Sequence, residues 1–367
     1  MMTMTVDTLR TWLEEGHPVT ILDVRPTTEY AEWSIPGSLH VDAYDALKAH
    51  DPAALSSVDL PMDRPVVTVC GAGKTSRIAA EQLEERGGEV YSLEGGMKAW
   101  SLSWNTADVP LSANMPHVIQ VRRTGKGCLS YVIGSGEEAF VIDASLDPQV
   151  YLDLATQHGW QITSVFDTHI HADHLSRSRQ LAEQSGATLF LPDQRRVSFP
   201  FTVMHDGNTL VTRSMMLTAL STPGHTPEST CYLLNNQVLF TGDTLFPTSI
   251  GRPDLEADTE QTQTRAQALY HSLHKLLALP AETLVLAGHT STPVPFDRVP
   301  LVTALAEIDE RVHLLHTPRT TFVQTTLAHI PPTPPNYQRI VRLNEAGIIP
   351  ESDVTELEAG ANRCAIS

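Results

Sequence analysis

The sequence is poor in cysteine, aromatic residues and positive charge, and it has no long apolar run. Its four cysteines, Cys70, Cys128, Cys231 and Cys364, show no Cys-x-x-Cys spacing, which predicts free thiols in a reducing compartment. Without a stretch of about 18 apolar residues or a secretory leader pattern, we expect a cytoplasmic protein with no membrane partner. The 43 acidic and 25 basic residues give a net charge of -18, which repels phosphate backbones and argues against nucleic acid.

The sequence also lacks a complete phosphate-binding loop of the Walker type. The stretch VCGAGKTSR at residues 69–77 contains the Gly-Lys pair, but Thr68 stands where such a loop needs its first glycine. What remains is a cysteine between an apolar run at 66–69 and a segment with a helical apolar face. This pattern predicts that Cys70 lies at the carboxyl end of a strand, just before a helix.

The order of the apolar segments predicts an α/β fold with two domains. The runs VTILDV, PVVTVC and EVYSL alternate with helical stretches up to about residue 100, which is typical of a parallel sheet with crossover helices. We expect a first domain at 1–108, a linker at 109–116 and a second domain at 117–367, a sandwich with strands inside and helices outside. The stretch PPTPP at 331–335 predicts a connector between the last helices.

Cys70 has the sequence surroundings of a reactive sulfur. The N–H groups and the positive dipole end at a helix N-terminus favour a thiolate over a thiol. Gly71 and Gly73 allow the loop to curl around the sulfur, and Lys74 and Arg77 add positive charge for a substrate anion. Such a thiolate can attack the outer sulfur of a sulfane donor and hold it as a persulfide. The alternative is an inert core cysteine at a strand end.

Further motifs in the first domain accompany this loop. They are Asp23-Val24-Arg25, Glu29-Tyr30, Ile35-Pro36-Gly37 and LEGGMKAW at 93–100. In this order, and together with the Cys70 loop, they resemble a single-domain rhodanese over nearly all of residues 1–108. The resemblance implies a sulfurtransferase domain that moves sulfane sulfur through a persulfide on Cys70.

The second domain contains a dense group of residues that bind metals. The stretch DTHIHADHL at 167–175 follows an apolar strand-like run and precedes a helical segment, which predicts a turn where side chains converge. Burying these imidazoles and carboxylates without a metal would cost a few kcal/mol for each unpaired group. His225, Asp243 and His289 each follow an apolar run, so we expect them to reach the same cleft from strand ends. The pattern indicates a metal site.

The pattern His-x-His-x-Asp-His, with a later His, Asp and His, resembles the metallo-β-lactamase superfamily over roughly residues 117–367. The resemblance implies an αββα sandwich and leaves two ligand sets open. A persulfide dioxygenase would hold one Fe(II) on His169, His225 and Asp243, with His171, Asp173, His174 and His289 orienting those ligands. A glyoxalase II would hold two Zn2+, one on His169, His171 and His225 and one on Asp173, His174 and His289, with Asp243 bridging.

Three features favour the dioxygenase. Gly251-Arg252-Pro253-Asp254 resembles a Gly-Arg-Thr-Asp segment of that family, and Arg252 is a candidate for binding a substrate carboxylate, with a structural salt bridge to Asp254 as the alternative. Ala361-Asn362-Arg363-Cys364 resembles the ending of that family, and we expect Cys364 to be structural. No counterpart of the basic glutathione-binding tail of glyoxalase II follows His289.

The leading hypothesis is a persulfide dioxygenase that is also a sulfurtransferase through Cys70. It would convert glutathione persulfide and O2 to sulfite and glutathione, and its first domain would use or form thiosulfate. The alternative enzyme is a dinuclear zinc thioester hydrolase with an accessory rhodanese domain, and a sulfur carrier with a structural metal is a third hypothesis. The sequence leaves open the thiol partner, the direction of sulfur transfer and the oligomeric state, although homo-oligomers are common.

Overall fold

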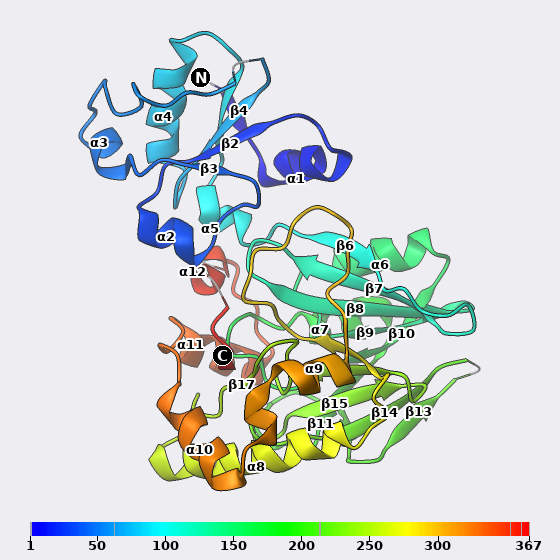
Figure 1. The fold of residues 1–367 in the computed structure, drawn as a ribbon. Coiled ribbons are helices and arrows are strands. Elements are labelled where there is room, and N and C mark those ends of the chain that lie inside the picture. The colour runs from blue at the N-terminus through cyan, green and yellow to red at the C-terminus, as the bar shows by residue number, and fades with distance from the viewer. Residues whose placement is uncertain (1, 62, 213, 353, 361, 367) are drawn as a thin grey trace.

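The computed structural model describes residues 2–61, 63–212, 214–352, 354–360 and 362–366, which form two α/β domains (Figure 1). The first domain is a parallel sheet with strand order β1-β5-β4-β2-β3. Its strands are β1 (Met2–Met4), β2 (Thr20–Asp23), β3 (Leu39–His40), β4 (Val66–Val69) and β5 (Val90–Leu93). Its helices are α1 (Val6–Glu15), α2 (Thr27–Glu32), α3 (Tyr44–Lys48), α4 (Thr75–Glu84) and α5 (Gly96–Trp100). The predicted parallel sheet with crossover helices is confirmed.

The β4–α4 unit that carries Cys70 follows from its local sequence. All four residues of β4 are buried, as expected for a central parallel strand that is covered on both faces. The helix α4 buries Ala79, Ala80 and Leu83 at helical spacing against the sheet. Gly96, at the start of α5, has a φ of +57°, and a Cβ there would lie 2.2 Å from the carbonyl oxygen of Cys70. Glycine at this position therefore allows α5 to pack against the cysteine loop.

The second domain is a sandwich of two mixed sheets. The first sheet has the order β12-β11-β10-β9-β8-β7-β6 and the second the order β13-β14-β15-β16-β18-β19. The first contains β6 (Asn105–Asp108), β7 (His117–Arg123), β8 (Cys128–Ser135), β9 (Glu138–Ile142), β10 (Gln161–Phe166), β11 (Thr188–Pro192) and β12 (Thr202–Met204). The second contains β13 (Thr209–Val211), β14 (Met216–Ser221), β15 (Thr230–Leu234), β16 (Val238–Gly242), β18 (Leu284–Ala287) and β19 (Thr303–Ala304). A separate antiparallel pair is formed by β17 (Ile250–Gly251) and β20 (Ala365–Ile366).

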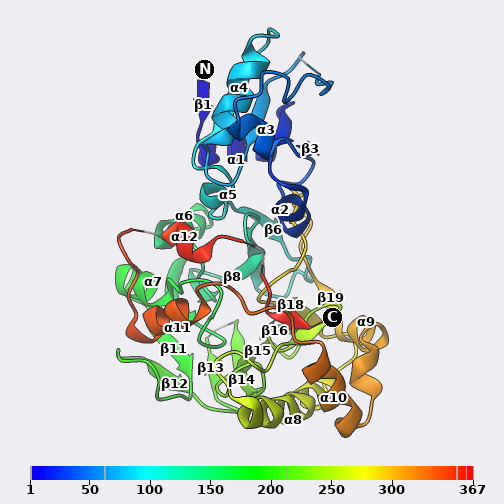
Figure 2. The same ribbon diagram turned by 90° about the vertical axis from the view of Figure 1, so that its left-hand side faces the viewer.

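Helices cover the outer faces of this sandwich (Figure 2). α6 (Pro148–Gln157) and α7 (Ser178–Ser185) pack on the first sheet, and α8 (Thr259–Leu277), α9 (Leu305–Arg311) and α10 (Arg319–Ala328) pack on the second. The remaining elements are the 3-10 turn η1 (His313–His316), α11 (Tyr337–Ala346) and α12 (Val354–Glu358). The predicted αββα sandwich is confirmed, and PPTPP connects α10 to α11 as expected. None of the described helices is long and apolar enough to cross a membrane.

The boundary between the domains differs from the expected one. β6 pairs antiparallel with β7, with Asn105 opposite Arg122, so residues 105–108 belong to the sheet of the second domain. Val109, at the start of the expected linker 109–116, is buried between the two sheets. The sequence did not reveal this strand because NTAD contains no apolar run, and only the presence of β7 makes it extended.

Side chains from both domains meet at the interface between them. Lys98 in α5 pairs with Glu356 in α12, and Glu32 at the end of α2 pairs with Arg363. The Trp100 ring packs near the Phe296 ring, with centroids 6.1 Å apart. The first domain therefore contacts the C-terminal segment of the second domain. This segment also reaches the metal-ligand cleft described below.

Candidate metal centre and cysteine loop

The seven predicted metal ligands lie together at one edge of the sandwich, and all are buried. His169, His171, Asp173 and His174 follow β10, and His225, Asp243 and His289 follow β14, β16 and β18. The structure thus brings together residues that the sequence placed at separate strand ends.

Three of these side chains form a compact group that fits one metal ion. The Nε2 atoms of His169 and His225 lie 3.8 and 3.5 Å from Oδ2 of Asp243. His169 Nε2 and Asp243 Oδ2 are buried and have no hydrogen-bond partner among the described residues. Unpaired buried groups of this kind are costly, and a cation between them would remove that cost. Two imidazoles and one carboxylate are also the donor set of a facial triad, which leaves coordination positions open.

The second ring nitrogen of each histidine fixes its tautomer. The Asp143 carboxylate can only accept, so the Thr168 hydroxyl donates to it at 2.9 Å and accepts from Nδ1–H of His169, also at 2.9 Å. Nδ1–H of His225 donates to the backbone carbonyl of Arg252 at 2.7 Å. In both histidines, Nε2 is left with the lone pair that a metal needs.

The electrostatics keep this group in its ligating form. Burial lowers the pKa of His169 well below its ordinary value and also lowers the pKa of His225, so both rings are neutral near neutral pH. Burial opposes ionisation of Asp243, but the adjacent His289 imidazole outweighs it and lowers the pKa of the carboxyl group. Neutral imidazoles and an ionised carboxylate are the protonation states that metal binding requires.

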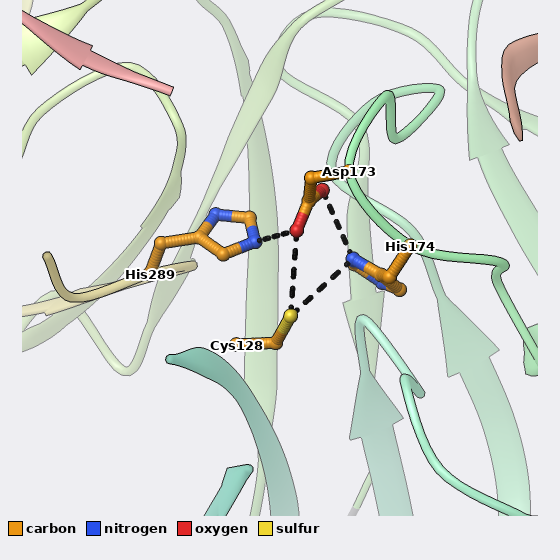
Figure 3. A group of neighbouring side chains, drawn as sticks. All are labelled: Cys128, Asp173, His174 and His289. Carbon is orange, nitrogen blue, oxygen red and sulfur yellow. Dashed lines mark hydrogen bonds and ion pairs between the residues drawn. The ribbon is translucent and has the colours of Figure 1, made fainter. Parts of the chain in front are cut away.

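Three of the other predicted ligands, Asp173, His174 and His289, form a second buried group together with Cys128 (Figure 3). Asp173 contacts Nδ1 of His174 through Oδ1 at 3.0 Å and Nε2 of His289 through Oδ2 at 2.8 Å. Cys128 Sγ lies 3.4 Å from the same Oδ2 and 3.7 Å from Nδ1 of His174. Nδ1 of His289 contacts Oδ1 of Asp243. His289 therefore has a carboxylate at each ring nitrogen.

His171 lies between these two groups. Its ring centroid is 4.3 Å from that of His169 and 4.2 Å from that of His174. Its Nε2 is 3.2 Å from Oδ1 of Asp143, whereas its Nδ1 is buried and unpaired among the described residues. Nε2 of His174 is unpaired in the same way. These two nitrogens are the atoms that a dinuclear arrangement would use.

Arg252 is placed as a structural residue rather than as a substrate contact. Its side chain is fully buried and makes a bidentate pair with Asp254, and its other guanidinium N–H groups donate to three backbone carbonyls. No donor is left for a substrate carboxylate, so the alternative of a salt bridge with Asp254 describes this residue. A Cβ on Gly251 would lie 2.0 Å from the carbonyl oxygen of Asp243, so the segment packs directly against the metal ligands.

The C-terminal motif also reaches the metal centre, although Ala361 lies outside the described residues. Nδ2 of Asn362 donates to Oδ2 of Asp173 at 3.0 Å. Cys364 is buried and lies near Asp243 and His289. Burial raises the pKa of the Cys364 thiol well above its ordinary value, which agrees with the expected structural role.

A cavity of about 250 Å³ adjoins the metal centre. His289 and Asn362 contribute to its lining, together with the apolar side chains of Leu129, Phe246 and Ala365. Thr248, Ser249 and residues 290–292 add polar groups to this lining. A concave site that combines apolar side chains with polar groups is typical of a small-molecule binding pocket.

The helix α2 of the first domain connects the cysteine loop with the rim of this cavity. A Cβ on Gly71 would lie 3.9 Å from the Glu29 carboxylate in α2. Trp33 directly follows α2. A Cβ added at Gly127 would lie 3.0 Å from the Trp33 ring, so this ring packs close to the Gly127 backbone. The Gly127 carbonyl accepts from the backbone N–H of Thr290, which lines the cavity. The segment 29–33 thus contacts the cysteine loop directly and reaches the cavity rim through Gly127.

Cys70 directly follows β4 and precedes α4, as predicted. Its Sγ accepts from the backbone N–H of Gly73 at 3.1 Å and lies 3.3 Å from Oγ of Ser76. Burial disfavours the thiolate, but the Ser76 hydroxyl and the loop hydrogen bonds outweigh it, so the pKa of Cys70 is lowered. This is the environment of an activated nucleophile, and its sulfur chemistry stays a prediction.

Lys74 and Arg77 are exposed and line a hollow of about 570 Å³ beside the cysteine loop. Glu81 and Glu94 share this lining, so the carboxylates moderate the positive potential of the two cations. The structure brings both predicted cations to the loop, and their contact with a substrate stays a prediction.

Three residues of the metal centre were missed from the sequence: Asp143, Thr168 and Cys128. Asp143 directly follows β9, so the strand-end reasoning that selected His225 and Asp243 would have found it. Thr168 lies inside the histidine-rich stretch and orients its neighbour. Cys128 stands in GKGCLSY, where no nearby residue type marks it as a ligand.

Comparisons with known proteins agree with this architecture. The rhodanese-like domain family matches residues 5–103, and the metallo-beta-lactamase superfamily matches residues 123–289. Hydroxyacylglutathione hydrolase from Rhizobium johnstonii is 36% identical over 154 residues, which cover 41% of this chain and 57% of that protein. The hydrolase of the same name from Brucella ovis is 32% identical over 158 residues, which cover 42% of this chain and 55% of that protein. The chain thus spans little more than half the length of these curated relatives.

Two solved structures share the sandwich. ETHE1 from Myxococcus xanthus is 30% identical with a TM-score of 0.55, and the match covers 62% of this chain and 97% of that chain. A metallo-beta-lactamase from Staphylococcus aureus has a TM-score of 0.58 at 24% identity, covering 64% of this chain and 74% of that chain, and shows the fold alone. The second domain is therefore a metallo-β-lactamase sandwich with a buried candidate metal centre. The chain belongs to the metallo-β-lactamase superfamily and carries a rhodanese domain in front of that sandwich.

Proposed function

We propose that the protein is a persulfide dioxygenase combined with a rhodanese sulfurtransferase. A persulfide R-S-SH, O2 and water would give the thiol R-SH, sulfite and two protons, so that the outer sulfur is oxidised and O2 is reduced. Glutathione is the proposed thiol, because the hydrolase relatives are named for a glutathione conjugate. Fe(II) held by His169, His225 and Asp243 would supply open coordination positions for O2 and the persulfide sulfur.

The observation that carries this proposal is the division of the ligands into two groups. Unpaired Nε2 of His169 and Oδ2 of Asp243 lie beside Nε2 of His225, whereas both ring nitrogens of His289 contact carboxylates. This division favours one metal on the triad, with His289 orienting the Asp243 carboxylate. The likeness to ETHE1 and the sequence resemblance to persulfide dioxygenases support the same assignment.

Residues of the chain would hold the ligands and the substrate in place. The Thr168 hydroxyl and the Arg252 carbonyl keep the two triad histidines in the ligating tautomer. Leu129 and Phe246 in the adjoining cavity would surround the carbon chain of the substrate and exclude bulk water from the sulfur.

The first domain would exchange sulfur with the same pool of thiols. The Cys70 thiolate attacks the outer sulfur of R-S-SH, a new S–S bond forms on Cys70, and the old S–S bond breaks to release R-SH. In the opposite direction, sulfite attacks the outer sulfur of the Cys70 persulfide, which forms thiosulfate and restores the Cys70 thiolate. Gly73 and Ser76 stabilise the thiolate in both directions.

A dinuclear zinc thioester hydrolase is the second candidate. Nδ1 of His171 and Nε2 of His174 are buried and unpaired among the described residues, as expected if each bound a metal. The relatives named hydroxyacylglutathione hydrolase point to the same activity. In that case two metals would generate a hydroxide for attack on a thioester.

Metal analysis of anaerobically purified protein, coupled to O2 consumption with glutathione persulfide, tests the proposal. We expect one iron per chain and O2 uptake that is lost in His225→Ala. Cys70→Ser is the matched control, because it removes a reactive residue of the other domain and should leave iron content and O2 uptake unchanged. Two zinc ions per chain, no O2 uptake and cleavage of S-lactoylglutathione would overturn the proposal in favour of the hydrolase.

A further inference from the structure

The loop between β18 and β19, residues 288–302, supplies part of the wall of the cavity beside the metal centre. Residues 290–292 and Leu301 line that cavity, so the lining comes from the two ends of the loop. The middle of the loop packs against the first domain (Figure 1 and Figure 2). The contact between the domains therefore bears on the shape of the cavity.

Two tryptophans of the first domain support this loop, one directly and one through a neighbouring turn. Phe296, in the middle of the loop, packs against the hydrophobic cluster of the first domain that contains Trp100, and the centroids of the two rings are 6.1 Å apart. Trp33 packs close to the backbone of Gly127, whose carbonyl accepts from the N–H of Thr290 at 2.9 Å. Both tryptophans are buried. Two separate points of the loop thus depend on aromatic side chains of the other domain.

Hydrogen bonds from the second domain fix the backbone of the loop around Phe296. Arg122 in β7 donates to the backbone carbonyls of Pro295 and Val299. Nδ2 of Asn105 in β6 donates to the Pro295 carbonyl at 3.1 Å, and Oδ1 of Asn105 accepts from Nε of Arg122 at 2.7 Å. None of these bonds involves the Phe296 ring. A substitution of Phe296 therefore removes the contact with the first domain and leaves these hydrogen bonds in place.

We propose that Phe296 is a positioning residue for the persulfide substrate, and that the first domain shapes the substrate cavity through this side chain. This role rests on the proposed function, because it takes the cavity as the place where the carbon chain of the thiol binds. A wall that is already ordered spares the substrate the cost of ordering the loop on binding, so it increases affinity without taking part in the reaction. The first domain would then serve the second reaction without any chemistry at Cys70.

Steady-state O2 uptake by full-length Phe296→Ala with glutathione persulfide tests this role. We expect KM for the persulfide to rise about 2–10-fold, which corresponds to the loss of order in one or two side chains, while kcat and iron content stay at the wild-type level. Phe296→Leu should recover most of the affinity, because an apolar side chain still packs against Trp100. Val299→Ala is the matched control, because Val299 lies in the same loop and is 58% exposed. Unchanged sulfur transfer from thiosulfate shows that the first domain stays folded.

Hydrogen–deuterium exchange without substrate separates this inference from the proposed function. Phe296→Ala should increase exchange in residues 288–302, including the amide of Thr290, and leave α8 unchanged. Unchanged exchange in the loop, an unchanged KM, or a joint fall of kcat and iron content would overturn the inference.

A wild-type protein that takes up no O2 rejects the dioxygenase alone. The exchange result then still decides whether Phe296 positions the loop, and KM for S-lactoylglutathione replaces KM for the persulfide. Normal O2 uptake by the wild-type protein, with no difference between Phe296→Ala and Val299→Ala, rejects the positioning role alone.

Discussion

The two candidate reactive centres of this chain differ in how far apart along the sequence their contacting residues lie. The Cys70 sulfur contacts Ser76, six positions away, within one strand–turn–helix unit. In the metal centre, Asp173 contacts His289, which is 116 positions away, and the ligands follow four different strands. The cysteine loop therefore depends mainly on local backbone geometry, whereas the metal centre depends on correct packing of both sheets. Substitutions in the sandwich should disable the second centre and leave the first one intact.

The largest effect should come from removing the carboxylate of the triad. Asp243→Ala leaves His169 and His225 without the negative ligand that they flank, so we expect iron content and O2 uptake to fall to background. Transfer of sulfur from thiosulfate to a thiol should stay close to the wild-type rate. Cys70→Ser should show the opposite pattern. Equal loss of both activities in either variant would contradict the independence of the two centres.

The next effect concerns the stability of the sandwich alone. The Glu358 carboxylate is fully buried, pairs with Arg123 and Arg177, and accepts from the backbone N–H of Leu175. Glu358→Gln leaves two buried guanidinium groups without their counterion, so we expect a loss of about 3–5 kcal/mol in the free energy of unfolding. Urea unfolding, followed separately for the two domains, measures this loss. Glu356→Gln is the control, because that carboxylate forms only an exposed pair worth about 0–1 kcal/mol.

The same glutamate predicts a pH dependence of stability. Burial opposes ionisation of Glu358, but Arg123 and Arg177 outweigh it and lower the pKa from 4.5 to about 2. Because the pKa is lower in the folded state, this stabilisation is present above pH 4.5 and is lost as the pH falls toward 2. The wild-type protein should therefore lose more stability than Glu358→Gln across this range. Parallel stability curves for the two proteins would contradict the assignment.

A smaller effect should follow from removing the hydrogen bond that orients one histidine of the triad, His169. Thr168→Val removes the hydroxyl that links Asp143 to Nδ1 of His169, so the ring loses its fixed tautomer. We expect metal affinity to fall about 10–100-fold, measured by competition with a chelator. Thr163→Val on β10 is the matched control, because the Thr163 hydroxyl contacts only the Ala139 carbonyl at 3.5 Å. Unchanged affinity in Thr168→Val would mean that the tautomer is fixed in another way.

The smallest change is expected at the cysteine loop. Ser76→Ala removes the hydroxyl that stabilises the Cys70 thiolate, so the pKa of Cys70 should rise. The thiolate then forms at higher pH, and the pH profile of thiosulfate sulfur transfer should shift toward alkaline values. The pH profile of O2 uptake serves as the internal control and should not move. A sulfur-transfer profile that stays in place would show that Ser76 does not set the pKa of Cys70.

Local patterns in the sequence were sufficient for the cysteine loop and for most of the metal ligands. The apolar run before Cys70, the two glycines after it and the helical periodicity of α4 all act within a few residues, so they place the sulfur without knowledge of the rest of the fold. The candidate ligands could be selected because each lies beyond the end of an apolar strand: His169, His171, Asp173, His174, His225, Asp243 and His289. Their convergence follows from the way in which strand ends meet at one edge of a sandwich.

Only the tertiary structure decided the roles of residues whose partners are distant and carry no local signal. The strand β6 exists because β7 offers it hydrogen bonds, although NTAD has no strand pattern of its own. The sequence left the pairing of Arg252 with Asp254 as one of two alternatives, and the structure decides for it because carbonyl groups of Pro332 and Arg363 occupy further donors. Cys128 meets Asp173 and His174 because β8 begins beside the loop that carries His289. Sequence periodicity reports which face of an element is buried, whereas the groups that share a buried site are set by long-range packing.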